Sequence, residues 1–189
     1  MIESDAIKLL FEVDDIASDI GLQHMLYGGT CLGAVRDKAF IDVDRDVAFC
    51  FLQEDFTKHY EAFAKALQEN GFEIELLDHR HERPWDGTPY GIKLHKYGIN
   101  CDFAGWFAKG KWRYVPGHKE AYMLVHKAEH FENLISIPFY ERLFKIPRDY
   151  KGFLYDKYGN WKNKHVEFDN VCKPSCRKEV RDGDDFWWV

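Results

Sequence analysis

The chain has 189 residues, of which 46% are hydrophobic and 16% aromatic, a composition typical of one folded domain and not of a disordered polypeptide. Its formal net charge of −6 provides no basic footprint, which argues against nucleic acid as a partner. The N-terminal residues are acidic and lack a long apolar run, so we expect no signal peptide, no membrane span and a cytoplasmic protein.

Hydrophobic spacing predicts alternating elements in the first 70 residues. In chain order these are a helix, a strand, a short helix, a strand and a long helix, over residues 4–20, 22–27, 30–37, 46–51 and 54–70. Ser4 and Gly21 are the expected N-cap and C-cap of the first helix. Gly71 is expected to end the last of these helices.

The rest of the chain is predicted to contain mostly strands. The expected strands cover residues 72–78, 91–96, 99–107 and 112–115. Residues 144–149 are expected to lead into a helix over residues 149–158. The pattern predicts an α+β fold, with a mixed sheet flanked by helices, in a single domain of residues 1–162. A charged tail over residues 163–189 is expected to dock only through Phe186, Trp187 and Trp188.

Gly28 and Gly29 stand between an expected strand and an expected helix. Adjacent glycines allow a sharp turn and bring bare backbone N–H groups close to an anion. The start of a helix adds a favourable dipole for negative charge. This arrangement is typical of a phosphate site, although an ordinary turn would use the same residues.

Asp44 and Asp46 follow this turn and are two residues apart. On an extended segment such side chains point to the same face, because side chains alternate along a strand. Mg²⁺ is commonly held by one or two carboxylates together with phosphate oxygens. The turn and the aspartates therefore indicate metal-assisted chemistry on a phosphate. A solvated acidic loop is the alternative explanation.

Three stretches of the chain, in order, match the signature of one family. The first is GGT at residues 28–30, LGAVR at residues 32–36, Phe40 with Ile41, and the Asp44-x-Asp46 pair. The second surrounds Asp102 at residues 99–103, and the third is IPRDYKGFLYDKYGNW at residues 146–161. Together they resemble the LicD/fukutin family, over most of the chain. The resemblance implies a nucleotidyltransferase-like fold.

The resemblance also implies an activity and a set of site residues. It implies transfer of a phospho-alcohol group, such as phosphocholine or ribitol phosphate, from a CDP-linked donor to a sugar or glycan hydroxyl, with Mg²⁺ or Mn²⁺ as cofactor. Asp44, Asp46 and Asp102 would be the catalytic and metal-binding residues, with Asp102 as an alternative general base. The substrate-binding residues would be Gly28, Gly29, Thr30 and Arg36, with Arg36 clamping a phosphate or making a structural salt bridge.

One position departs from the family pattern. Ala48 stands where the family usually has a third aspartate, two residues beyond the second. Asp42 lies two residues before Asp44 and would extend the row in the other direction if the strand is regular there. Two alternatives therefore stand beside the phosphotransferase: an enzyme that transfers a nucleotide from a nucleoside triphosphate, and a metal-deficient nucleotide-binding module.

Overall fold

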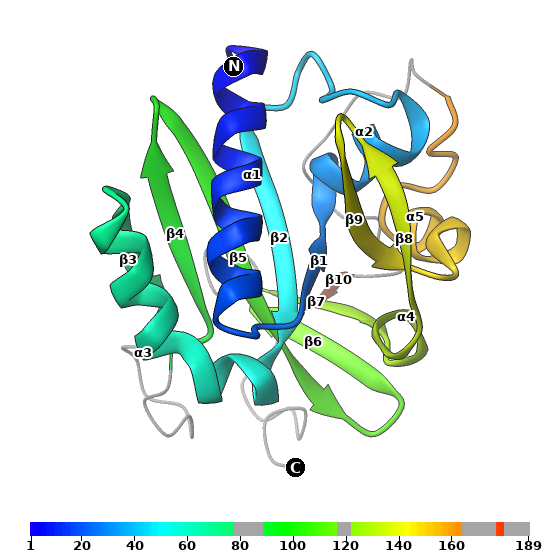
Figure 1. Cartoon of the computed structure of the whole chain (residues 1–189). Coiled ribbons are helices and arrows are strands. Elements are labelled where there is room, and N and C mark those ends of the chain that lie inside the picture. The colour runs from blue at the N-terminus through cyan, green and yellow to red at the C-terminus, as the bar shows by residue number, and fades with distance from the viewer. Residues whose placement is uncertain (78–88, 117–121, 164–176, 180–189) are drawn as a thin grey trace.

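The fold is built around one long strand, β5 (Ile99–Lys109). The computed structural model describes residues 1–77, 89–116, 122–163 and 177–179. The first part of β5 pairs in parallel with β2 (Asp46–Leu52) and, on its other edge, antiparallel with β4 (Gly91–Lys96). The last residues of β5 pair with β6 (Trp112–Pro116), so that β5 joins two wings of one mixed sheet (Figure 1).

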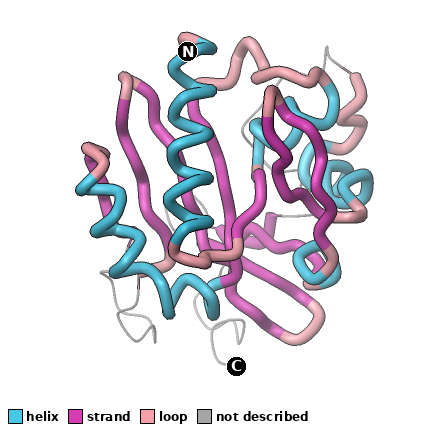
Figure 2. The backbone as a smooth tube through the Cα atoms, in the orientation of Figure 1, coloured by secondary structure: helices cyan, strands magenta, loops and turns pink. Residues whose placement is uncertain are grey.

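The remaining strands extend this sheet or form a separate hairpin. Four further strands add antiparallel neighbours to the sheet: β1 His24–Leu26, β3 Glu73–Leu77, β7 Tyr122–Lys127 and β10 Arg177–Glu179. The hairpin consists of β8 (Leu134–Phe139) and β9 (Arg142–Pro147). The described helices are α1 Glu3–Asp19, α2 Gly28–Arg36, α3 Gln53–Glu69, α4 Glu129–Glu132 and α5 Tyr150–Tyr158. Figure 2 shows the hairpin standing beside the main sheet.

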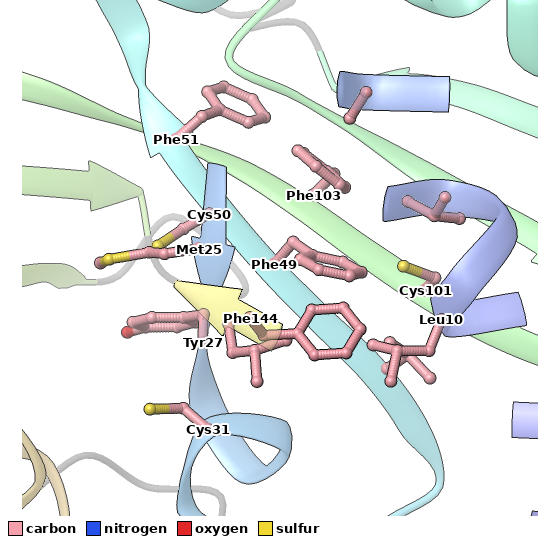
Figure 3. Packing of buried hydrophobic residues seen from close by; sticks show 14 of the residues in the cluster. Leu10, Met25, Tyr27, Cys31, Phe49, Cys50, Phe51, Cys101, Phe103 and Phe144 are labelled. Atoms are coloured by element: carbon pink, nitrogen blue, oxygen red, sulfur yellow. The ribbon is translucent and has the colours of Figure 1, made fainter. Parts of the chain in front are cut away.

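One face of β2 and β5 carries the main hydrophobic core. Phe49 and Phe103 are register partners, and their ring centroids lie 5.1 Å apart. Phe51 stacks on Phe56 of α3 at 4.2 Å, and Phe63 of the same helix meets Phe103 at 5.0 Å. Figure 3 shows Phe49, Phe51 and Phe103 along one side of the two strands, with Leu10 of α1 nearby. This face is therefore sealed by α1 and α3.

The opposite face of the same strands is divided into two parts. At one end Trp106 is buried among Tyr27, His126 and Phe131, with ring centroids 5.1 to 5.4 Å away. Phe153 of α5 closes this second aromatic cluster, 4.7 Å from His126. At the other end the polar residues of β2 and β5 stay partly exposed. The fold thus leaves a polar stretch of sheet next to the start of α2.

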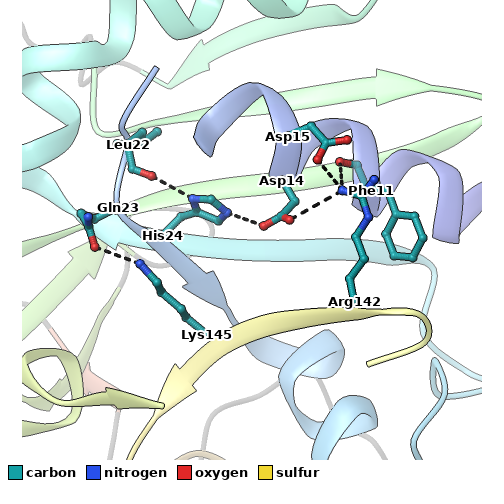
Figure 4. A network of polar contacts seen from close by, with 8 residues as sticks. All are labelled: Phe11, Asp14, Asp15, Leu22, Gln23, His24, Arg142 and Lys145. Atoms are coloured by element: carbon teal, nitrogen blue, oxygen red, sulfur yellow. Dashed lines mark hydrogen bonds and ion pairs between the residues drawn. The ribbon is translucent and has the colours of Figure 1, made fainter. Parts of the chain in front are cut away.

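A polar network fastens the hairpin to the N-terminal elements (Figure 4). Arg142 of β9 donates to the Phe11 carbonyl oxygen at 3.3 Å and pairs with Asp15. It also lies 3.9 Å from Asp14, whose other oxygen is 2.8 Å from His24 Nε2. The network therefore links β9 to both α1 and β1.

Most of the predicted elements are confirmed within a few residues. Gly21 adopts φ +79°, and its N–H closes α1 on the Ser18 carbonyl at 3.0 Å, as expected of a C-cap glycine. Ser4 is not the N-cap, because α1 begins at Glu3 with Ile2 in that position. No helix of the described residues is long and apolar enough to cross a membrane.

The region between β6 and α5 was not predicted correctly. It contains β7, α4 and the hairpin, none of which we expected. Residues 144–147 belong to β9, and the chain then enters α5 at Tyr150, close to the expected helix start at residue 149. Pro138 and Pro147 stand within these strands and weaken the sequence signal, because proline is unfavourable in central strands. The boundary between residues 162 and 163 stays a prediction, and Phe186, Trp187 and Trp188 lie outside the described residues.

Candidate active site

The start of α2 is bound to the middle of β2. The Tyr27 N–H donates to the Ala48 carbonyl at 2.9 Å, and the Ala48 N–H donates to the Thr30 hydroxyl oxygen at 2.9 Å. Thr30 therefore uses its side chain to hold the helix against the strand. Gly28 adopts φ +56°, a conformation that favours glycine. The expected turn is thus the first turn of the helix itself.

This first turn leaves its backbone donors available. The initial N–H groups of any α-helix lack intrahelical acceptors. Among the described residues, no acceptor is found for the N–H groups of Gly28, Gly29 or Thr30. They point from the positive end of the helix dipole, so they are suited to bind a phosphate.

Asp44 packs directly against Gly29. A Cβ at position 29 would lie only 1.9 Å from Asp44 Oδ2, so no other residue fits there without displacing the carboxylate. Asp44 is 7% exposed, and its Oδ1 accepts the Arg45 N–H at 3.2 Å. Its Oδ2 has no hydrogen-bond partner within the described part of the chain. The glycine pair and the first aspartate are therefore parts of one site.

The charge of Asp44 is poorly compensated. Burial, followed by the neighbouring Asp46 carboxylate, raises the pKa of Asp44 to about 7. A buried oxygen without a partner beside a second carboxylate is a suitable place for a divalent cation, which would satisfy the oxygen and relieve the repulsion. The residues present thus fit the expected Mg²⁺ or Mn²⁺, with Asp44 and Asp46 as ligands.

Asp102 lies on the neighbouring strand. In the parallel register Asp46 is opposite Asn100, and Ala48 is opposite Asp102. Register partners share a face of the sheet, so Asp46, Ala48 and Asp102 face the same side. Asp46 and Asp102 both line a groove of about 440 Å³. Within the described ranges, however, no three Asp, Glu, His or Cys side chains are grouped closely enough to hold a metal ion.

The groove extends from the aspartates across two further strands. Polar residues along it come from β3, β4 and β5 and include Glu73, Lys93, His95 and Asn100. Such a mixed set of donors and acceptors suits a ligand with several hydroxyl groups.

Asp42 does not extend the acidic row. It is exposed and belongs to a turn at residues 42–43, after which the Asp44 N–H returns to the Ile41 carbonyl at 2.9 Å. The strand begins only at Asp46, so the regular alternation that would align Asp42 with Asp44 and Asp46 is absent. The regular strand on which the shifted register depends is therefore absent.

Arg36 has a structural role in place of the expected phosphate clamp. It lies at the last residue of α2, roughly 12 Å from the glycines at 1.5 Å per residue. Its guanidinium donates to Asp37 Oδ2 at 2.7 and 3.0 Å and to the Trp161 carbonyl at 3.3 Å. These contacts hold the guanidinium at the end of α2 that is opposite to the glycines.

One residue of the site was missed from the sequence. Lys157 of α5 is only 8% exposed, and its Nζ lies 3.8 Å from the ring centroid of Tyr27, the residue that precedes the glycines. Its positive charge acts to lower the pKa of Asp44. The only available signal was a lysine next to the YG pair of the third matching stretch, and that pattern assigns it no role.

The contact between positions 29 and 44 predicts a strong coupling. Gly29→Ala should lower the free energy of unfolding by roughly 1–3 kcal/mol, because the new methyl overlaps the Asp44 carboxylate. In an Asp44→Ala background the same change should be neutral or stabilising, since alanine favours a helix over glycine by about 0.5–1 kcal/mol. Urea unfolding of the four proteins measures the coupling. Additive effects would contradict the contact.

Because the pKa of Asp44 is raised, we predict that Asp44→Asn increases thermal stability at high pH but not at low pH. The pKa of about 7 in the folded state lies above the usual 3.8, so the stability from this carboxyl is complete below pH 3.8 and is lost as the pH rises through 7. With a chelator present, Asp44→Asn should therefore have the higher Tm at pH 8 and nearly the wild-type Tm at pH 4. Each kcal/mol of change in the free energy of unfolding shifts the Tm by about 2–4 °C.

The control for this prediction is Asp42→Asn, which also removes one carboxylate from the loop but at an exposed position. Its Tm should follow the wild-type curve across the pH range. A gap between Asp44→Asn and wild type that does not change with pH would show that Asp44 titrates normally.

Comparison with solved structures gives distant likenesses. The antibiotic-resistance factor ANT(2″)-Ia is 14% identical with a TM-score of 0.48, and the alignment covers 77% of this chain and 66% of that chain. A proposed nucleotidyltransferase from Thermotoga maritima is 11% identical with a TM-score of 0.49, covering 82% and 86%. Among curated proteins, no significant match was found.

Comparison with protein families gives a clear result. The family model described as LicD/FKTN/FKRP, nucleotidyltransferase domain, matches residues 21–149. The matched segment contains the glycines, the acidic pair and Asp102, and it covers well over half of the chain. The chain therefore belongs to the LicD/FKTN/FKRP nucleotidyltransferase-domain family.

Proposed function

We propose that this protein transfers a phospho-alcohol group, such as phosphocholine, from a CDP-linked donor to a glycan hydroxyl, with Mg²⁺ or Mn²⁺ as cofactor. Family membership supports a transferase that acts on phosphorus-containing groups. The observation that carries the proposal is the packing of Asp44 on Gly29. It puts a desolvated carboxylate, with Asp46 nearby, at the positive end of a helix whose N–H groups are available.

In this proposal the donor diphosphate binds at the first turn of α2. The N–H groups of Gly28, Gly29 and Thr30 hold phosphate oxygens, and Asp44 and Asp46 hold the cation. Mg²⁺ held by these carboxylates would supply positive charge that stabilises the leaving CMP. The carboxylates would fix the position of that charge. The hydrogen bond from the Ala48 N–H of β2 to the Thr30 hydroxyl oxygen holds the strand against the start of α2.

The acceptor is proposed to lie in the groove beside Asp102. Asp102 takes the proton from the acceptor hydroxyl, the hydroxyl oxygen forms a bond to the phosphorus of the alcohol phosphate, and the bond from that phosphorus to CMP breaks. General-base assistance of this kind is worth about 10²–10⁴-fold. The polar residues along the groove, Lys93, His95 and Asn100, are placed to hydrogen-bond a sugar.

A second candidate is a nucleotide-binding module without turnover. Ala48 favours it, because it removes a carboxylate at the position opposite Asp102. The absence of a three-ligand metal group in the described residues favours it as well. Such a module would bind nucleotides equally well with and without Mg²⁺ and would release no product.

The proposal predicts how product release depends on the aspartates. Wild type should release CMP from at least one of CDP-choline, CDP-ribitol or CDP-glycerol in the presence of Mg²⁺ and an acceptor. Asp46→Asn and Asp102→Asn should each reduce this rate by on the order of 10²-fold or more, because each removes a charge but keeps the shape. Asp42→Asn is the matched control and should retain the wild-type rate, since Asp42 is exposed in a turn.

Chromatography of the nucleotide products separates the alternatives. Pyrophosphate released from CTP or ATP, without CMP from any CDP-alcohol, would replace the proposal with nucleotidyl transfer. Nucleotide binding without any product, and with no effect of Mg²⁺ on affinity, would support the binding module. Full activity of both asparagine variants would remove the assigned roles.

A further inference from the structure

The side chain of Lys157 is buried, and no carboxylate of the described residues lies in ion-pair contact with its ammonium. Its side chain belongs to α5 and is 8% exposed. Its Nζ lies 3.8 Å from the ring centroid of Tyr27 and 5.6 Å from the ring centroid of Tyr158. Among the residues that the structure describes, it forms no ion pair with a carboxylate and no hydrogen bond. A buried ammonium without an anionic partner is unfavourable, which points to an anionic ligand.

The ammonium points at the start of α2. A Cβ placed on Gly28 would lie 3.9 Å from Lys157 Nζ, 3.9 Å from the Tyr158 hydroxyl and 3.6 Å from the Ala48 Cβ. Lys157 Nζ and the first residue of α2 therefore border one small volume. A phosphate oxygen in that volume would meet both a fixed positive charge and backbone donors.

The same volume borders position 48. In the family pattern that position carries an aspartate, whereas here it is Ala48. An aspartate there would lie beside Gly28 and would be available to pair with the ammonium. With alanine there, Lys157 has no carboxylate in ion-pair contact within the described part of the chain. The two features that depart from expectation, a missing carboxylate and an unpaired ammonium, are thus neighbours across one glycine.

We propose that Lys157 binds a phosphate oxygen of the diphosphate donor at Gly28, and that it supplies there the positive charge that a cation bound to an aspartate at position 48 would otherwise bring. This inference deepens the proposed function and rests on it for the identity of the donor, but not for the binding of a diphosphate. It makes part of the affinity for diphosphate independent of divalent metal.

The test is calorimetric binding of inorganic pyrophosphate and of CDP to the full chain, in EDTA and in Mg²⁺. Wild type should bind both in EDTA. Lys157→Met should weaken this metal-free binding by on the order of 10- to 100-fold, the range expected for a lost charged hydrogen bond. Lys157→Arg should retain most of it. Lys151→Met removes an exposed lysine of the same helix and should have no effect.

Thermal unfolding, with and without pyrophosphate, separates a role of Lys157 in binding from a structural role. Removing a buried charge that has no ion-pair partner should leave the Tm of Lys157→Met unchanged or raise it, while abolishing the rise in Tm that pyrophosphate causes in wild type. If Lys157 only packs on Tyr27, the variant should lose stability and still respond to pyrophosphate, which would overturn the proposal. Failure of wild type to bind pyrophosphate or CDP in EDTA would overturn it as well.

A second variant tests the link to position 48. Ala48→Asp introduces a carboxylate next to the ammonium, so it should weaken metal-free pyrophosphate binding about as much as Lys157→Met. Unchanged binding in Ala48→Asp would contradict the link. Suppose instead that wild type releases no CMP from any CDP-alcohol and still binds pyrophosphate without metal in a way that depends on Lys157. That result would refute the proposed donor and leave this inference standing.

Discussion

The contact between Gly29 and the Asp44 carboxylate is the constraint on which the site depends. A loop that follows α2 returns to the first turn of that helix, and only a glycine leaves room for the acid. The contact removes the carboxylate from water and places it beside Asp46, which raises its pKa to about 7. One steric requirement therefore brings the glycine pair together with the acidic pair. It also creates a place where a positive charge would be favourable.

The alternation of β2 and β5 decides which side of the sheet carries chemistry. Phe49 and Phe103 face the helices α1 and α3, and the residues that alternate with them along β2 and β5 face the other way. On that other side the aromatic cluster around Trp106 covers only one end. The uncovered end is polar because Asp46 and Asp102 are there, next to the start of α2. The core and the groove are thus two faces of the same strands.

The sequence predicted the parts of the site that lie close together in the chain. Local periodicity and turn chemistry singled out the glycines, Asp44 and Asp46 as candidates, and the resemblance added Asp102. Asp42 was misplaced because a turn at residues 42–43 interrupts the assumed strand. Lys157 could not be found, since its role depends on how α5 packs on Tyr27, a contact across 130 positions of sequence. The hairpin was missed because its prolines obscure the strand pattern.

Arg36 illustrates how a residue outside the site can still govern it. By donating to the Trp161 carbonyl, it joins the far end of α2 to the segment that follows α5. The same two helices meet again where Lys157 approaches Gly28. The two segments are therefore held together at two separate points. The distance between the Lys157 ammonium and Gly28 thus depends partly on an arginine at the opposite end of α2.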